Sequence, residues 1–232
     1  MKNIDFLREH YSEQINALNS FIKDVYHFLP HQDHSLIRFG GGTALAMYYF
    51  QHRLSFDIDL FVTDVQVLNY LSPKHWIEET ANFNSSKYID LSNHIRVLEN
   101  KNNIKIDVLV SQGGSADFLL DDSKTLFTET IYVESVKDII AKKIVYRRNN
   151  NLTRDIIDIA IAVTQEDDFL SKLLESGLVN IDDLKELKNS LTKLDRKTFD
   201  EEVEIVSPFE KYIKDAQNAP EIISEACQKV LV

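Results

Sequence analysis

Residues 40–60, GGGTALAMYYFQHRLSFDIDL, join a glycine-rich turn to a strand-like run that carries two acids. Three of the six glycines in the chain stand together at 40–42. Successive glycines give the backbone freedom and let it approach a ligand closely. Thr43 can cap the helix predicted after it, which leaves backbone N–H groups for an anion. Gly41, Gly42 and Thr43 are therefore candidate phosphate contacts, with a flexible turn as the alternative.

Asp57 and Asp59 lie two residues apart in FDIDLFV, residues 56–62, whose alternation predicts a strand. Residues i and i+2 of a strand point to one side, so both carboxylates face the same way. The alternating apolar residues then face a core: Phe56, Ile58 and Leu60. Two like charges on one strand face repel unless a cation lies between them, and Mg²⁺ favours carboxylate oxygens. A metal site is one interpretation, and a solvated strand face is the other.

Asp107 is a third acid, the single carboxylate in the apolar run NIKIDVLV, residues 103–110. A charge in such a strand normally needs a partner. If this strand pairs near 56–62, three carboxylates converge in a layout that suits two metals about 4 Å apart. An exposed ion pair with Lys105 is the structural alternative.

The rest of the chain predicts an α+β fold. Helical spacing covers residues 4–29 and 66–83, and strand-like runs follow at 88–100, 103–110 and 129–135. Helical patterns dominate after about residue 134. We expect an α+β domain over residues 1–132 and a helical domain over 133–232.

Composition limits the classes of function. The chain has 232 residues and a net charge of −11, which argues against bulk DNA binding. No apolar run approaches the roughly 18 residues that a membrane span needs, so no membrane role is expected. A single cysteine, Cys227, cannot form an internal disulfide, which fits a reducing cytoplasm.

A basic strip interrupts this acidic chain, because residues 142–154 hold five Lys or Arg residues and no acid. Lys143 and Arg147 are spaced i, i+4 and share a helix face, as do Asp155 and Asp158 at i, i+3. The cations favour a small anionic ligand such as a triphosphate, with a solvated helix face as the alternative. An interhelical salt bridge is the structural alternative for the two acids.

Four elements in this order resemble the AbiEii/AbiGii-type nucleotidyltransferase toxin family of the polymerase-β-like superfamily. They are Gly40-Gly41-Gly42-Thr43-Ala44-Leu45, Arg53-x-Ser55-x-Asp57-Ile58-Asp59-Leu60-Phe61, Lys143, and Arg154-Asp155-x-x-Asp158. The resemblance implies the nucleotidyltransferase fold, a mixed β-sheet with flanking helices, followed by a helical C-terminal domain. It further implies a metal-dependent transfer of a nucleotide from a nucleoside triphosphate to an acceptor.

The resemblance also assigns roles to residues. The glycines and Ser55 would contact the phosphates, and Asp57 and Asp59 would bind Mg²⁺ or Mn²⁺. Asp107 would complete the metal site and help to activate the acceptor hydroxyl. Lys143 would neutralise phosphate charge, and Arg147 and Asp155 would lie at the nucleotide. Asp158 would be a catalytic residue. Asp155 and Asp158 together are the later acidic element of the family pattern. Arg53 is a candidate for orienting the turn from Ser55 to Asp57.

Relatives in this family are toxins paired with an antitoxin, and some transfer nucleotides to RNA. We therefore expect a toxin that acts on RNA, such as tRNA, or on protein, with an antitoxin as partner. One alternative is transfer to a small, aminoglycoside-like molecule. Another is a nucleotide-binding interaction module without catalysis.

Overall fold

A computed structural model describes residues 3–111, 117–147 and 152–231. The chain divides into two compact units. The first comprises Met1–Tyr48 with Ser55–Ser135, and the second comprises Tyr49–Leu54 with Val136–Val232. The short segment 49–54 therefore belongs with the C-terminal helices although it lies among the first unit's residues in sequence. The domain division after residue 132 stays a prediction.

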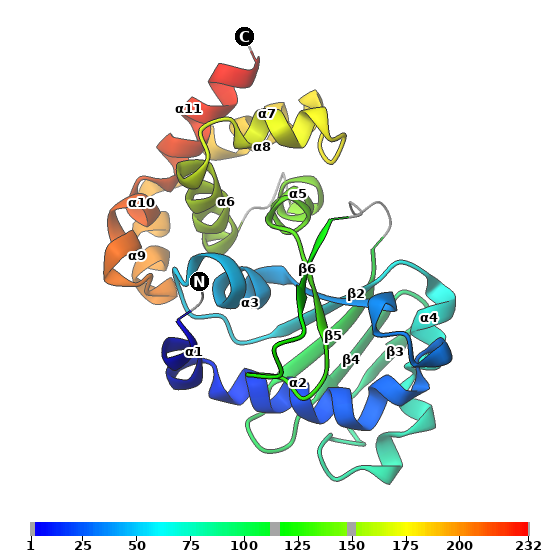
Figure 1. Ribbon diagram of the computed structural model, residues 1–232. Helices are drawn as coiled ribbons and strands as arrows, with labels where there is room; N and C mark the ends of the chain where they lie inside the picture. The colour runs from blue at the N-terminus through cyan, green and yellow to red at the C-terminus, as the bar shows by residue number, and fades with distance from the viewer. Residues whose placement is uncertain (1–2, 112–116, 148–151, 232) are drawn as a thin grey trace. The chain divides into compact units, whose positions relative to one another are not determined.

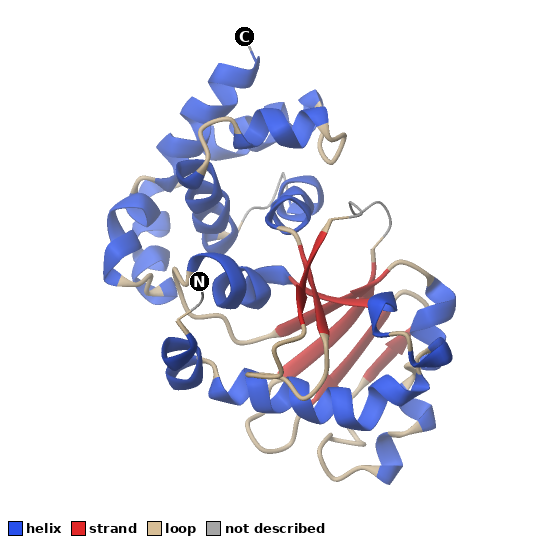
Figure 2. Cartoon of the chain, viewed as in Figure 1, coloured by secondary structure: helices blue, strands red, loops and turns tan. Residues whose placement is uncertain are grey.

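A seven-stranded mixed sheet forms the centre of the first unit (Figures 1 and 2), in the order β3-β4-β5-β2-β1-β7-β6. Its strands are β1 Ile37–Gly40, β2 Ile58–Val62, β3 Ile89–Leu91, β4 His94–Leu98, β5 Lys105–Val110, β6 Phe118–Asp121 and β7 Ile131–Glu134. The pairs β2–β5 and β1–β7 are parallel, and the other neighbours are antiparallel. The predicted α+β class is confirmed.

One face of this sheet is apolar and fully buried, as the alternation in the sequence predicts. Its central residues are Phe39, Ile58, Leu60, Ile106 and Val108, each at most 1% exposed. The helices of this unit are α1 Ile4–His10, α2 Ser12–Val25, α3 Gly41–Leu45 and α4 Val65–Tyr70. The buried face of α2 includes Phe21, which makes edge-to-face contacts with Trp76 and Phe83.

Five local predictions were wrong. The strand-like run over 88–100 is two antiparallel strands, β3 and β4, and Thr43 lies inside α3, whose N-cap is Gly40. The single helix over 4–29 is two helices, because the backbone leaves helical geometry at Tyr11 (φ −127°, ψ 17°). The helix over 66–83 stops at Tyr70, and short 3₁₀ turns follow at Pro73–His75 and Ile77–Glu79. Phe56 is 63% exposed and not in the core, because β2 begins two residues later and the alternation does not extend to it.

The secondary-structure elements of the second unit's described residues are all helices (Figure 2), while its residues 51–54 are irregular. It contains α5 Val136–Arg147, α6 Thr153–Gln165, α7 Phe169–Glu175, α8 Ile181–Thr192, α9 Arg196–Val206, α10 Ile213–Gln217 and α11 Ala219–Leu231. Helix α6 is buried over nearly its whole length and packs against α5, α7, α9, α10 and α11. No helix in the described part of the chain is long and apolar enough to cross a membrane.

Candidate active site

The structure brings the three predicted acids of the first unit to adjoining strand positions. Asp59 on β2 is the register partner of Gly40 on β1 and of Asp107 on β5. Neighbouring strands lie about 4.8 Å apart, so Asp59 and Asp107 are next to each other on one face of the sheet. Asp57 directly precedes β2, and its Oδ1 lies 3.6 Å from Nζ of Lys105, which shares a face of β5 with Asp107. The convergence expected from the two sequence runs therefore exists at the backbone level.

Gly41 is required where it stands. Its φ is +67°, a left-handed conformation that favours glycine. A Cβ atom at this position would lie 2.0 Å from Asp59 Oδ2, closer than any real contact. Asp57, Asp59 and Asp107 together are called the acidic row. The backbone of the glycine turn thus lies directly against one of its carboxylates, that of Asp59.

Gly40 reveals an acid that the sequence reasoning missed. A Cβ atom there would lie 2.1 Å from Oε2 of Glu134, which ends β7 and is 3% exposed. Strand β7 pairs with β1 on the side opposite β2, so Asp59 and Glu134 flank the same glycine. An acid at the end of the strand-like run IYVE was the available signal.

Thr43 and Ser55 fasten the turn before β2 to α3. Thr43 is fully buried, its Oγ1 lies 2.8 Å from Ser55 Oγ, and its hydroxyl donates to the carbonyl of Asp57. Gln14 Nε2 donates to the Ser55 carbonyl at 3.2 Å. These bonds fix the backbone that presents Asp57. Phosphate contacts by Thr43, Ser55 and Gly42, a residue of the first turn of α3, stay predictions.

Asp107 is held by two basic side chains of β4. Arg96 donates from Nε to Oδ1 at 2.7 Å and from an Nη to Oδ2 at 3.1 Å, and His94 Nε2 lies 2.5 Å from Oδ1. The Asp107 side chain is 8% exposed. The ion pair considered with Lys105 is not the one found, because Lys105 Nζ lies 3.6 Å from Oδ1 of Asp57. Sequence reasoning missed His94 and Arg96.

The carboxylates of the acidic row raise the pKa of the Arg96 guanidinium. Its pKa is raised, chiefly by the hydrogen bond to Asp107, and burial opposes the rise. The charges of Asp107, Asp57 and Asp59 raise it further. Arg96 therefore offsets part of the charge of these carboxylates, most directly that of Asp107, which it contacts.

The residues fit a divalent metal in part. Asp57 and Asp59 supply hard oxygen donors on one face, which suits Mg²⁺ or Mn²⁺. Asp107 does not fit as it stands, because both of its oxygens accept bonds from Arg96 or His94. Across the described residues, no group of three or more His, Cys, Asp and Glu side chains is arranged to hold a metal ion.

The other predicted site residues form a buried ion network in the second unit. Asp158 on α6 is fully buried and accepts from Arg53 Nε and an Arg53 Nη, both at 2.7 Å. His52 Nε2 lies 2.6 Å from Asp158 Oδ1, and Lys143 Nζ lies 3.0 Å from Oδ2. Burial raises the pKa of Asp158, but Arg53, Lys143 and His52 outweigh it and hold that pKa well below its ordinary value.

Asp155 extends this network to the last turn of α5. Lys143 Nζ and an Arg147 Nη each lie 2.5 Å from a different oxygen of Asp155, which is fully buried. The salt bridge considered with Arg147, Arg148 or Arg154 is found for Asp155, whose partner is Arg147. Asp158 pairs instead with Arg53, His52 and Lys143. His52 was not predicted, although it directly precedes Arg53. Contact of Lys143, Arg147, Asp155 or Asp158 with a nucleotide stays a prediction.

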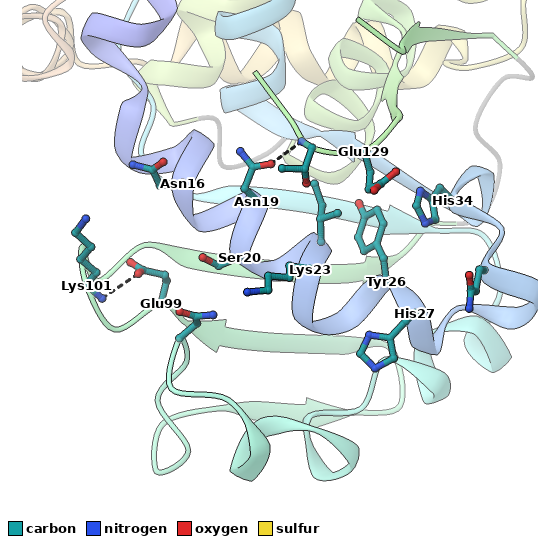
Figure 3. Close-up of a pocket in the computed structure, with 14 residues that line it drawn as sticks. Asn16, Asn19, Ser20, Lys23, Tyr26, His27, His34, Glu99, Lys101 and Glu129 are labelled. Carbon is teal, nitrogen blue, oxygen red and sulfur yellow. Dashed lines mark hydrogen bonds between the residues drawn. The ribbon is translucent and has the colours of Figure 1, made fainter. Parts of the chain in front are cut away.

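A separate pocket of the first unit, about 850 Å³ in volume, contains none of the predicted site residues (Figure 3). Asn16, Asn19 and Lys23 of α2 line one side, and Glu99 and Lys101 from the turn after β4 line another. Its walls mix apolar side chains such as Ile22 with charges of both signs, so they select no one class of ligand.

The chain is similar in fold to solved structures that cover most of its length. JHP933 from Helicobacter pylori is 14% identical with a TM-score of 0.51, over 96% of this chain and 90% of that one. A second H. pylori protein, described as a nucleotidyltransferase, is 13% identical with a TM-score of 0.50, over 94% and 92%. The nucleotidyltransferase toxin MenT4 from Mycobacterium tuberculosis is 18% identical with a TM-score of 0.43, over 74% and 68%. No curated protein matches the chain.

The family follows from the sequence model for the nucleotidyl transferase AbiEii toxin of type IV toxin–antitoxin systems, which matches residues 23–219. The chain belongs to this family. The predicted resemblance, the nucleotidyltransferase fold and the enzyme class are confirmed: the protein is a nucleotidyltransferase of the toxin type.

Proposed function

We propose that this protein transfers a nucleotide from a nucleoside triphosphate to an acceptor, with a divalent metal held by Asp57 and Asp59. The observation that carries the proposal is the acidic row, in which Asp59 and Asp107 are register partners and Asp57 lies 3.6 Å from Lys105 of the same strand as Asp107. The close approach of Gly41 to the Asp59 carboxylate supports it, because a glycine turn against metal-binding acids suits a triphosphate.

The chemistry is one displacement at phosphorus. The acceptor oxygen forms a bond to the α-phosphorus, the bond from that phosphorus to the bridging oxygen of the β-phosphate breaks, and pyrophosphate leaves. A divalent metal supplies charge stabilisation for the attacking and leaving oxygens. Asp107 is the candidate for taking the acceptor proton, and it must first be released from Arg96 to do so.

We propose RNA, such as tRNA, or a protein as the acceptor, and an antitoxin protein as the partner. Family membership supports both, because the AbiEii family consists of toxins from toxin–antitoxin systems. A small-molecule acceptor has no feature of the described residues in its favour, so it enters as an outcome of the test.

The test is transfer of label from nucleoside triphosphates carrying ³²P at the α or the γ position, offered with RNA, protein and small-molecule pools. Nucleotidyl transfer puts α label, but not γ label, on one acceptor pool. Asp59→Asn should abolish this transfer and Mn²⁺ binding together. Label appearing from the γ position, or full activity in Asp59→Asn, would contradict the proposal.

A further inference from the structure

Arg96 occupies a position that the proposed reaction does not explain. It is the antiparallel register partner of Asp107 and lies on the same sheet face as the acidic row. Its guanidinium engages both oxygens of Asp107. Cross-strand partners of opposite charge stabilise a sheet, so this pair is also a structural contact.

The electrostatics indicate a further role. Three carboxylates on adjoining positions of one face repel one another unless a cation offsets their charge. Arg96 is the cation placed directly against this group, because it donates to both oxygens of Asp107 from the neighbouring strand. Arg96 therefore offsets part of the charge that a bound metal ion would offset.

The Arg96–Asp107 pair is more exposed to solvent than the buried network in the second unit. The Arg96 side chain is 41% exposed, so it can exchange its contact with Asp107 for water. Arg53, which holds Asp158 in a similar two-pronged way, is 4% exposed and has no such alternative. The first pair is displaceable, and the second is fixed.

We propose that Arg96 is an internal counter-ion that competes with the divalent metal for Asp107. Recruitment of Asp107 to a metal at Asp57 and Asp59 then requires Arg96 to release Oδ2, the oxygen that His94 does not contact. The inference rests on the proposed function, which places a metal at Asp57 and Asp59. It adds a residue that sets metal affinity and that the family assignment does not name.

The experiment measures Mn²⁺ affinity of the full chain by electron paramagnetic resonance of free Mn²⁺. Arg96→Gln removes the competitor and should tighten binding about tenfold or more, because a charge-assisted hydrogen bond to Asp107 no longer has to be broken. Lys105→Gln is the matched control. It removes a neighbouring positive charge that pairs with Asp57, and it should tighten binding only about twofold.

A double variant isolates Asp107. In an Asp107→Asn background the further change Arg96→Gln should alter Mn²⁺ affinity no more than the Lys105→Gln control does. Should Arg96→Gln fail to fold, Arg96→Lys retains the charge without the two-pronged contact and should tighten binding to a smaller degree. The Mn²⁺-induced rise in melting temperature should follow the same order.

Unchanged or weaker Mn²⁺ binding in the Arg96 variants overturns the inference, as does a gain that persists in the Asp107→Asn background. Asp59→Asn keeps this separate from the proposed function. If Asp59→Asn abolishes binding while Arg96→Gln has no effect, the metal site stands and the competitor role is wrong. If Asp59→Asn binds Mn²⁺ normally, the metal site itself is wrong and the inference fails with it.

Discussion

Replacing Asp158 should destabilise the protein strongly, because its carboxylate is the anionic centre of a fully buried network. Asp158→Asn removes the carboxylate that Arg53 contacts, and the Arg53 side chain is 4% exposed. Lys143, which is 10% exposed, loses one of its two carboxylate contacts and keeps Asp155. Removing one partner of a buried ion pair costs about 3–5 kcal/mol. For a chain of this size that corresponds to a fall in melting temperature of about 6–20 °C.

The assay is thermal unfolding followed by circular dichroism at neutral pH. Asp200→Asn is the matched control, because Asp200 lies in the same unit and forms one exposed pair with Arg196 at 2.9 Å. Such a surface pair contributes at most about 1 kcal/mol, so the control should melt within a few degrees of the wild type. An Asp158→Asn protein that melts with the control would refute the buried network as a source of stability.

Strong acid should reduce the difference in stability between the wild type and Asp158→Asn. The pKa of Asp158 in the folded protein lies below the ordinary 3.8, so its contribution is fully present above pH 3.8 and is lost as pH falls through the lower folded value. The stability gap between wild type and Asp158→Asn should therefore be constant near neutral pH and narrow only in strong acid.

Three further outcomes follow from the same structure. Gly41→Ala should lower stability and Mn²⁺ affinity more than Gly177→Ala does. Both glycines have positive φ, but a Cβ at Gly41 would meet Asp59 while a Cβ at Gly177 meets nothing within 4 Å. Equal losses of stability in urea unfolding would show that the contact with Asp59 is unimportant. Burial lowers the pKa of His52 below 6.5, so the unfolded chain binds a proton at a higher pH than the folded protein does. The free energy of unfolding should therefore decline as pH falls below 6.5. Melting temperature measured against pH should show a weaker decline in His52→Gln. Burial raises the pKa of Cys227 to about 11, so the thiol should react with Ellman's reagent at pH 8 only after denaturation, and rapid labelling of native protein would contradict its burial.

The sequence predicted the acidic row because its geometry is local. The spacing of Asp57 and Asp59 places both on one face of any strand, and the apolar alternation around Asp107 places that acid in a second strand. Pairing of the two runs was then the one added assumption, and the register of β2 with β5 supports it. The glycine turn was recognisable for the same reason, since three successive glycines are a local signal.

The partners of these acids could not be predicted from spacing. Lys105 is the nearest cation to Asp107 in sequence, but residues i and i+2 of a strand lie about 6.6 Å apart, while direct cross-strand partners lie about 5 Å apart. Arg96, the direct cross-strand partner, therefore pairs with Asp107 in place of Lys105. Its position depends on the register of the β4–β5 hairpin. The contacts of His52 and Arg53 with Asp158 span 106 and 105 residues, so no local pattern encodes them.

The path of the backbone limits how this protein can be taken apart. The chain passes between its two units after Tyr48, after Leu54 and after Ser135. A single cut at residue 132 would leave Arg53 on one fragment and its carboxylate partner Asp158 on the other. Neither fragment is then a self-contained piece for separate expression, and an exchange of helical regions between relatives would have to carry residues 49–54 along with the helices.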